Sequence, residues 1–192
     1  MGYSEIWAPW RLAYVQSEKK EEENLSALSF LDGADPTCFI CQAAADVVEN
    51  DAKRHVVYRG ERVLVLLNRF PYNNGHLLVT PRRHVARLDQ LTPDEHLELM
   101  ETLSRMVRIL EETIHPHGFN AGLNLGSVAG AGLPGHLHWH LVPRWNGDTN
   151  FMPVLGCVNV IPQSLDALWE LLRKTLEASL ERENRPFCEG KR

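Results

Sequence analysis

The sequence predicts an α+β fold in which an antiparallel sheet of about five strands is combined with one long helix and a C-terminal helix. Short runs of apolar or alternating residues, bounded by turn residues, indicate the strands at 55–58, 63–67, 76–80, 120–126 and 136–142. Two other stretches, 92–114 and the segment from Ser164 onward, carry apolar residues three or four positions apart, which is the helical period.

The length and charge of the chain narrow its possible partners. Its 192 residues suit one compact domain with appended arms, and 44% of them are hydrophobic, as in a globular protein. The formal net charge of −5 argues against a non-specific nucleic-acid partner.

No run approaches the length of a membrane span and no leader is evident, so we expect a cytoplasmic protein. We divide it into an N-terminal arm and linker (1–37), a core domain (38–145) and a C-terminal extension (146–192).

The long helix has a clear predicted start. Thr92 is a candidate N-cap, Pro93 follows in the first turn, and Glu95 stands three residues after the cap, which is the pattern of a capping box. The apolar residues expected to face the core are Leu97, Met100, Leu103, Val107, Leu110 and Ile114. In the C-terminal helix the expected stripe is Leu165, Leu168, Trp169, Leu172 and Leu176.

The run 135–145 holds three histidines at a spacing of two, His136, His138 and His140. Successive side chains of a strand point to opposite faces, so the three imidazoles would share one face, with apolar side chains on the other. A single histidine at such a place would most simply be a surface residue of an edge strand. Three in strict alternation, between a glycine-rich loop and Pro143, favour a functional row.

This run resembles the signature of the histidine triad (HIT) superfamily, His-x-His-x-His followed by apolar residues. The resemblance extends to the segments 68–79 and 124–127, and it implies a HIT-like form of the predicted fold. It assigns His138 as the nucleophile that forms a nucleotidyl-histidine at the α-phosphate of a nucleotide. It also implies that His140 contacts phosphate oxygens or the departing group. The role of His136 stays open between orienting the site and binding zinc.

The same resemblance implies the remaining substrate contacts. Asn68 occupies the position that contacts ribose hydroxyls, and Asn124 the position that contacts phosphate. Backbone N–H groups of the glycine-rich loop are expected to stabilise the transition state; the loop residues concerned are Gly130, Ala131, Gly132 and Leu133. Several family members carry a Ser, Thr or Gln just before the triad, where this chain has 132–135, Gly-Leu-Pro-Gly. Backbone amides or Ser127 could take over that task.

Cys38 and Cys41 form a Cys-x-x-Cys pair, which offers two of the four ligands of a tetrahedral zinc site. On their own, the two residues are equally well explained as small buried thiols. In some HIT proteins and related uridylyltransferases, distant histidines complete the pair, and the matching positions here are His84 and His136. The resemblance therefore implies a structural zinc ion held by four protein ligands.

Within the superfamily, the segments 6–11, 116–126 and 143–151 resemble bacterial diadenosine tetraphosphate phosphorylases, also called ATP adenylyltransferases. This resemblance implies phosphorolysis, in which inorganic phosphate removes AMP from His138. Two alternatives stay open: a hydrolase of dinucleoside polyphosphates or nucleoside phosphoramidates, and a non-catalytic nucleotide-binding protein.

Members of the superfamily are commonly homodimers, and the aromatic arm with Trp7 and Trp10 is a candidate strap against the core or a partner subunit.

Overall fold

The computed structural model describes residues 27–150, 152 and 160–183. The predicted α+β fold is confirmed: five antiparallel strands form one sheet in the order β1-β2-β3-β5-β4. The strands are β1 (Val56–Arg59), β2 (Val63–Leu67), β3 (Leu77–Pro81), β4 (Gly118–Leu123) and β5 (Trp139–Arg144). The arm with Trp7 and Trp10 lies outside the described residues.

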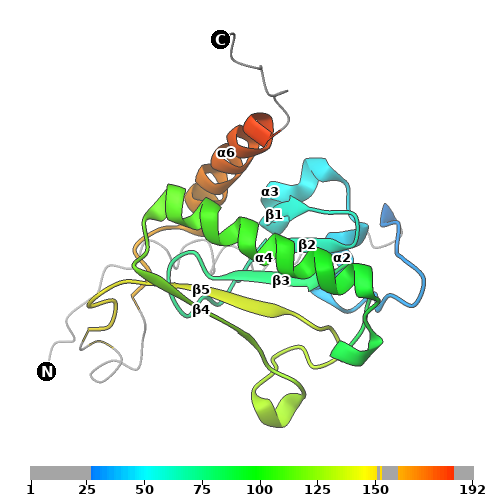
Figure 1. Ribbon diagram of the computed structural model, residues 1–192. Coiled ribbons are helices and arrows are strands. Elements are labelled where there is room, and N and C mark those ends of the chain that lie inside the picture. Colours follow the sequence, from blue (N-terminus) through cyan, green and yellow to red (C-terminus); the bar gives the residue numbers. More distant parts are fainter. Residues whose placement is uncertain (1–26, 151, 153–159, 184–192) are drawn as a thin grey trace, which may run out of the picture.

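Two long helices cover one face of the sheet. Helix α4 (Pro93–Ile114) lies over β2, β3 and β5, and α6 (Leu165–Glu183) packs against α4 and β1 (Figure 1). The shorter elements are α2 (Phe39–Ala45), α3 (Asp51–Arg54), η2 (Val48–Asn50), η3 (Leu88–Gln90) and η4 (Ser127–Ala129). Within the described residues, no helix is both long and apolar enough to span a bilayer.

The sheet has an apolar core on each face. On the α4 side, strand residues such as Val65, Leu77 and Leu141 join the buried residues of α4 and α6, including Leu168, Leu172 and Leu176 as predicted. On the other side, Leu64 and Leu66 pack with Ile40 and Cys41 of α2. All five residues of β2 are buried, because the strand is covered on both faces.

Helix α4 begins as predicted, and most of its predicted stripe faces the core: Leu103 and Leu110 are buried, and Val107 and Ile114 pack against the core cluster. Glu95 N–H donates to Thr92 Oγ1 and Thr92 N–H donates to Glu95 Oε2, which completes the capping box. Leu97 and Met100, predicted to face the core, are 59% and 43% exposed. The buried stripe is Leu99, Leu103, Met106, Ile109 and Leu110. Each residue advances the helix by about 100°, so Leu97 lies about 200° from Leu99, on the opposite side.

Gly75, just before β3, occupies a position that excludes a side chain. Its φ is +76°, and a Cβ there would lie 2.6 Å from Ile114 Cδ1 and 3.1 Å from Pro143 Cγ. We expect Gly75→Ala to lower the free energy of unfolding by about 2–4 kcal/mol, from left-handed backbone strain plus overpacking. Urea denaturation measures this. Gly118→Ala is the matched control, since a Cβ there meets nothing within 4 Å; equal losses in the two variants would contradict the prediction.

Candidate active site and metal centre

The histidine row leads into β5, which begins at Trp139, three residues later than the predicted start at His136. The backbone of Leu137 makes its hydrogen bonds outside the β-sheet ladder. Its N–H donates to Val85 O at 2.6 Å, and its carbonyl accepts from Thr80 Oγ1 at 2.7 Å. Alternation is nevertheless kept, because Leu137 and Leu141 belong to the core under α4. The three imidazoles lie on the opposite, α2 side of the sheet.

His138 has one ring nitrogen occupied and one available. Its side chain is buried, and Nδ1 lies 2.8 Å from the backbone carbonyl oxygen of His136. A carbonyl only accepts hydrogen bonds, so Nδ1 carries the proton and Nε2 keeps its lone pair. This is the tautomer that a nucleophilic imidazole requires.

His140 lies beside His138, with ring centroids 5.0 Å apart, and it contacts a histidine that the sequence analysis missed. His76 is 1% exposed, and its Nε2 lies 2.9 Å from His140 Nδ1. Burial, followed by repulsion from His140 and His138, lowers the pKa of His76 to about 3. Burial and His138 also lower the pKa of His140. Both rings are therefore neutral at pH 7.

The register of the sheet explains why His76 belongs to the site. Leu78 of β3 is paired with His140, and His76 lies two residues earlier, so its side chain points to the same face. The signals in the sequence were this period of two along 76–80 and the family resemblance of the segment 68–79, which contains His76. Neither shows that His76 meets His140 until β3 is known to neighbour β5.

Asn68 lies next to His76. Its Oδ1 accepts the N–H of Phe70 at 2.9 Å, and its Nδ2 is 3.3 Å from His76 Nδ1. A carbonyl oxygen has two lone pairs, so Asn68 Oδ1 still has room for a second donor such as a ribose hydroxyl. The ribose contact stays a prediction.

The backbone amides of the glycine-rich loop differ in whether they are already hydrogen-bonded within the protein. The N–H of Gly130 donates to Ser127 O at 3.0 Å, and that of Ala131 donates to Gly126 O at 3.2 Å. The amides of Gly132 and Leu133 have no acceptor among the described residues. Asn124 Nδ2 donates to Gly130 O at 3.4 Å, which ties the loop to the end of β4. Of the four loop residues predicted to bind phosphate, Gly132 and Leu133 are therefore the two whose amides are available to it.

A cavity of about 490 Å³ lies beside His140. Its lining comes from the 72–73 turn, β4, β5 and the 148–149 turn, and includes Asn120 and Asn124. Among the described residues that line it, Arg144 is the one cationic side chain; its guanidinium contacts both carboxylate oxygens of Asp148, at 2.5 and 3.0 Å, and donates to Asn120 Oδ1. Arg144 lowers the pKa of Asp148 to about 2. This pairing neutralises the charge of Arg144 inside the cavity.

Cys38, Cys41, His84 and His136 converge as predicted, with one ligand atom of each residue within 4.8 Å of the others. The Sγ to Nδ1 distances are 3.4 Å from Cys38 to His136 and 3.2 Å from Cys41 to His84. A tetrahedron with the bond lengths usual for zinc has edges of about 3.3–3.8 Å. The donor set and its spacing therefore fit a metal ion bound by two thiolates and two imidazoles.

The protonation of these ligands also suits a cation. His136 Nε2 donates to Pro81 O at 2.8 Å, which leaves Nδ1 unprotonated toward the thiols. Burial lowers the pKa of His136 to about 4, so this imidazole stays neutral. Burial, reinforced by Cys38, raises the pKa of Cys41 to about 12. A bound cation reverses this effect by stabilising the thiolate.

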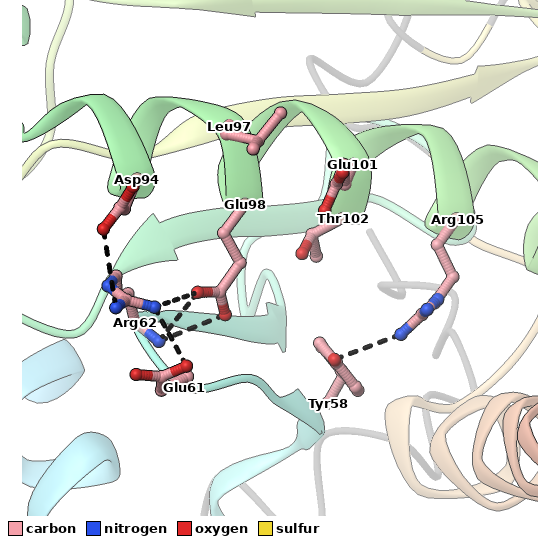
Figure 2. A pocket seen from close by; sticks show the side chains of 9 residues that line it. All are labelled: Tyr58, Glu61, Arg62, Asp94, Leu97, Glu98, Glu101, Thr102 and Arg105. Carbon is pink, nitrogen blue, oxygen red and sulfur yellow. Dashed lines mark hydrogen bonds and ion pairs between the residues drawn. The ribbon is translucent and has the colours of Figure 1, made fainter.

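A second cavity, of about 420 Å³, lies between α4 and the β1–β2 turn (Figure 2). Its charged groups are largely paired with one another. Arg62 contacts Glu61, Asp94 and Glu98, and Arg105 donates to Tyr58 Oη at 3.1 Å. We interpret this cluster as a structural contact that holds the β1–β2 turn against α4, because its charged groups are paired with one another within the protein.

Comparison with known proteins places this geometry in a family. A family model described as "HIT domain" matches residues 49–147. A Mycobacterium tuberculosis protein named "AP-4-A phosphorylase" is 43% identical over 161 residues, which cover 83% of this chain and 77% of the relative. A Schizosaccharomyces pombe protein named "Bis(5'-nucleosyl)-tetraphosphatase [asymmetrical]" is 34% identical over 93 residues, 48% of this chain and 50% of the relative.

The fold comparison agrees. The crystal structure of a zinc-bound histidine triad family protein from Mycobacterium smegmatis matches with a TM-score of 0.55 and 28% identity, covering 67% of this chain and 87% of that protein. The family model and the mycobacterial relative both span the histidine row and the strands that position it. The chain belongs to the HIT family.

Proposed function

We propose that this protein is an enzyme that transfers a nucleotidyl group from dinucleoside polyphosphates through a covalent intermediate on His138. The reaction we propose is phosphorolysis of diadenosine tetraphosphate to ATP and ADP. The observation that carries the proposal is the free Nε2 lone pair of His138, fixed by the 2.8 Å hydrogen bond from Nδ1 to His136 O. The mycobacterial relative named "AP-4-A phosphorylase" supports the choice of substrate and of phosphorolysis.

The first step is attack by Nε2 of His138 on the α-phosphorus. A nitrogen–phosphorus bond forms, the bond to the bridging oxygen breaks, and ATP leaves with the electron pair of that bond. The positive charge that the ring acquires is stabilised by the His136 carbonyl, which keeps its hydrogen bond from Nδ1. In the second step an oxygen of inorganic phosphate attacks the same phosphorus. ADP leaves and the lone pair returns to His138.

The surrounding donors stabilise charge on the phosphoryl oxygens. The free amides of Gly132 and Leu133 lie just before the triad, and Asn124 and Ser127 are expected on the phosphate side. Asn68 is expected to contact the ribose. None of these groups needs to change its protonation state, so they suit a reaction whose leaving group is already anionic.

We propose that the metal centre holds zinc. Two thiolates and two imidazoles are typical zinc ligands, and a site closed by four protein ligands leaves no position for a reactive water. The zinc ion therefore supplies structural stability and no chemistry. His136 would serve both centres, because its imidazole faces the thiols while its carbonyl orients His138.

Incubation with diadenosine tetraphosphate, with and without inorganic phosphate, tests the reaction. We expect repeated turnover only when phosphate is present, with ATP and ADP formed in equal amounts, and chromatographic separation of the products measures both. AMP and ATP formed without phosphate would indicate the hydrolase instead. Binding of the nucleotide with no turnover under either condition would indicate a nucleotide-binding protein.

A further inference from the structure

The hydrogen bonds around His76 fix the position of its proton. The backbone N–H of Tyr72 points at His76 Nδ1 from 3.1 Å. Asn68 Nδ2 lies 3.3 Å from the same atom and 3.5 Å from His76 Nε2, and the Asn68 amide is oriented by the N–H of Phe70, which its Oδ1 accepts. The Tyr72 N–H can only donate, so His76 Nδ1 accepts. A neutral imidazole then carries its proton on Nε2.

This proton determines the state of His140. His76 Nε2 lies 2.9 Å from His140 Nδ1, so Nε2–H donates and His140 Nδ1 accepts. His140 must then carry its own proton on Nε2. That atom is buried and has no hydrogen-bond partner among the described residues. A buried donor without an acceptor is costly, and such a group is usually satisfied by a ligand or water.

We propose that His76 is a positioning residue that fixes His140 as a neutral Nε2–H donor to the departing phosphate, and not as an acid that protonates it. The inference rests on the proposed function, since it specifies how the leaving group of that reaction is held. It also restricts the substrate class.

The network disfavours the charged form of His140. An imidazolium would carry a proton on both nitrogens, and its Nδ1–H would meet the Nε2–H of His76 at 2.9 Å. His76 cannot relieve this contact by moving its proton to Nδ1, because Nδ1 already faces Tyr72 N–H and Asn68 Nδ2. The neutral donor is the one state of His140 compatible with all these contacts.

A site with a neutral donor suits leaving groups that depart as anions. A polyphosphate leaves without a proton, whereas the amine of a nucleoside phosphoramidate must be protonated as the phosphorus–nitrogen bond breaks. The stretch just before the triad offers no hydroxyl for this purpose, since residues 132–135 are Gly-Leu-Pro-Gly. We therefore expect turnover of dinucleoside polyphosphates and poor turnover of adenosine 5′-phosphoramidate.

Two substitutions of His76 separate its two hydrogen bonds. His76→Gln places an amide nitrogen near the former Nε2, which preserves a donor to His140. His76→Asn places its amide near the former Nδ1, which preserves an acceptor for Tyr72 N–H and removes the donor to His140. His96→Asn, at an exposed histidine of α4, controls for the substitution itself. The side-chain ¹⁵N spectrum of histidine-labelled protein reports the tautomer of His140 directly.

We expect the Nε2–H tautomer of His140 in the wild type and in His76→Gln, and a mixture of tautomers in His76→Asn. The kcat for diadenosine tetraphosphate should fall about 100-fold in His76→Asn, as when one transition-state donor is lost, and about threefold in His76→Gln. Equal losses in the two variants with an unchanged His140 tautomer would overturn the inference, as would a wild-type His140 protonated on Nδ1.

The spectrum separates this inference from the proposed function. A wild type with the Nε2–H tautomer but no turnover of any nucleotide refutes the function and leaves the tautomer assignment intact. A wild type that turns over the phosphoramidate as fast as the tetraphosphate refutes the inference about the leaving group. If His76→Asn does not fold, the wild-type spectrum and the His76→Gln variant still decide.

Discussion

His138→Ala protein is expected to form no nucleotidyl-enzyme and to turn over diadenosine tetraphosphate on the order of 10⁴-fold or more slowly than the wild type. The reason is specific to this side chain: it is the member of the row whose Nε2 lone pair is free, with Nδ1 bonded to His136 O. Intact-protein mass spectrometry after mixing with substrate detects the added AMP, and product formation gives the rate.

The matched control for this experiment is His96→Ala, which removes an exposed imidazole of α4. We expect that variant to keep the AMP adduct and the wild-type rate. Circular dichroism checks that His138→Ala keeps its fold, which is necessary because His138 is 7% exposed. An AMP adduct that persists in folded His138→Ala protein would show that another residue is the nucleophile.

Much of this site could be predicted from local patterns. Three histidines at a spacing of two need only one extended segment to share a face, and Cys38 and Cys41 are only three positions apart in the chain. His84 and His136 required the family resemblance, because nothing local connects them to the cysteines. The structure brings the four residues together across β3 and the loop before β5.

The features that were missed depend on tertiary contacts. His76 enters the site because β3 pairs with β5, and no pattern in one sequence determines that neighbour. Two residues of the α4 stripe, Leu97 and Met100, were wrongly predicted to face the core, because they fit the helical period as well as Leu99 does and only packing decides between them. The number of glycines in the loop did not reveal that the amides of Gly130 and Ala131 bond within the loop.

The second large effect is expected at the metal centre. In Cys38→Ser/Cys41→Ser protein we expect no bound zinc and a loss of about 3–5 kcal/mol in the free energy of unfolding. The two thiols, 1% and 2% exposed, connect the start of α2 to the sheet through His84 and His136. Elemental analysis by plasma mass spectrometry gives the zinc content, and denaturation gives the stability. Wild-type zinc content in the double variant would refute the site.

Loss of the metal should also lower the reactivity of the nucleophile His138, because His136 belongs to both the metal centre and the active site. His136 directs Nδ1 to the thiols, while its carbonyl accepts the proton of His138 Nδ1. Mutation of groups that orient a metal ligand through a hydrogen bond typically lowers activity by about 10–100-fold. His84→Asn, which removes one ligand and leaves His136 in place, should therefore lower both the zinc content and the rate of AMP transfer to His138. His96→Asn should change neither. If His84→Asn lost its zinc yet transferred AMP at the wild-type rate, the two centres would be independent, and the His136 backbone alone would orient the nucleophile.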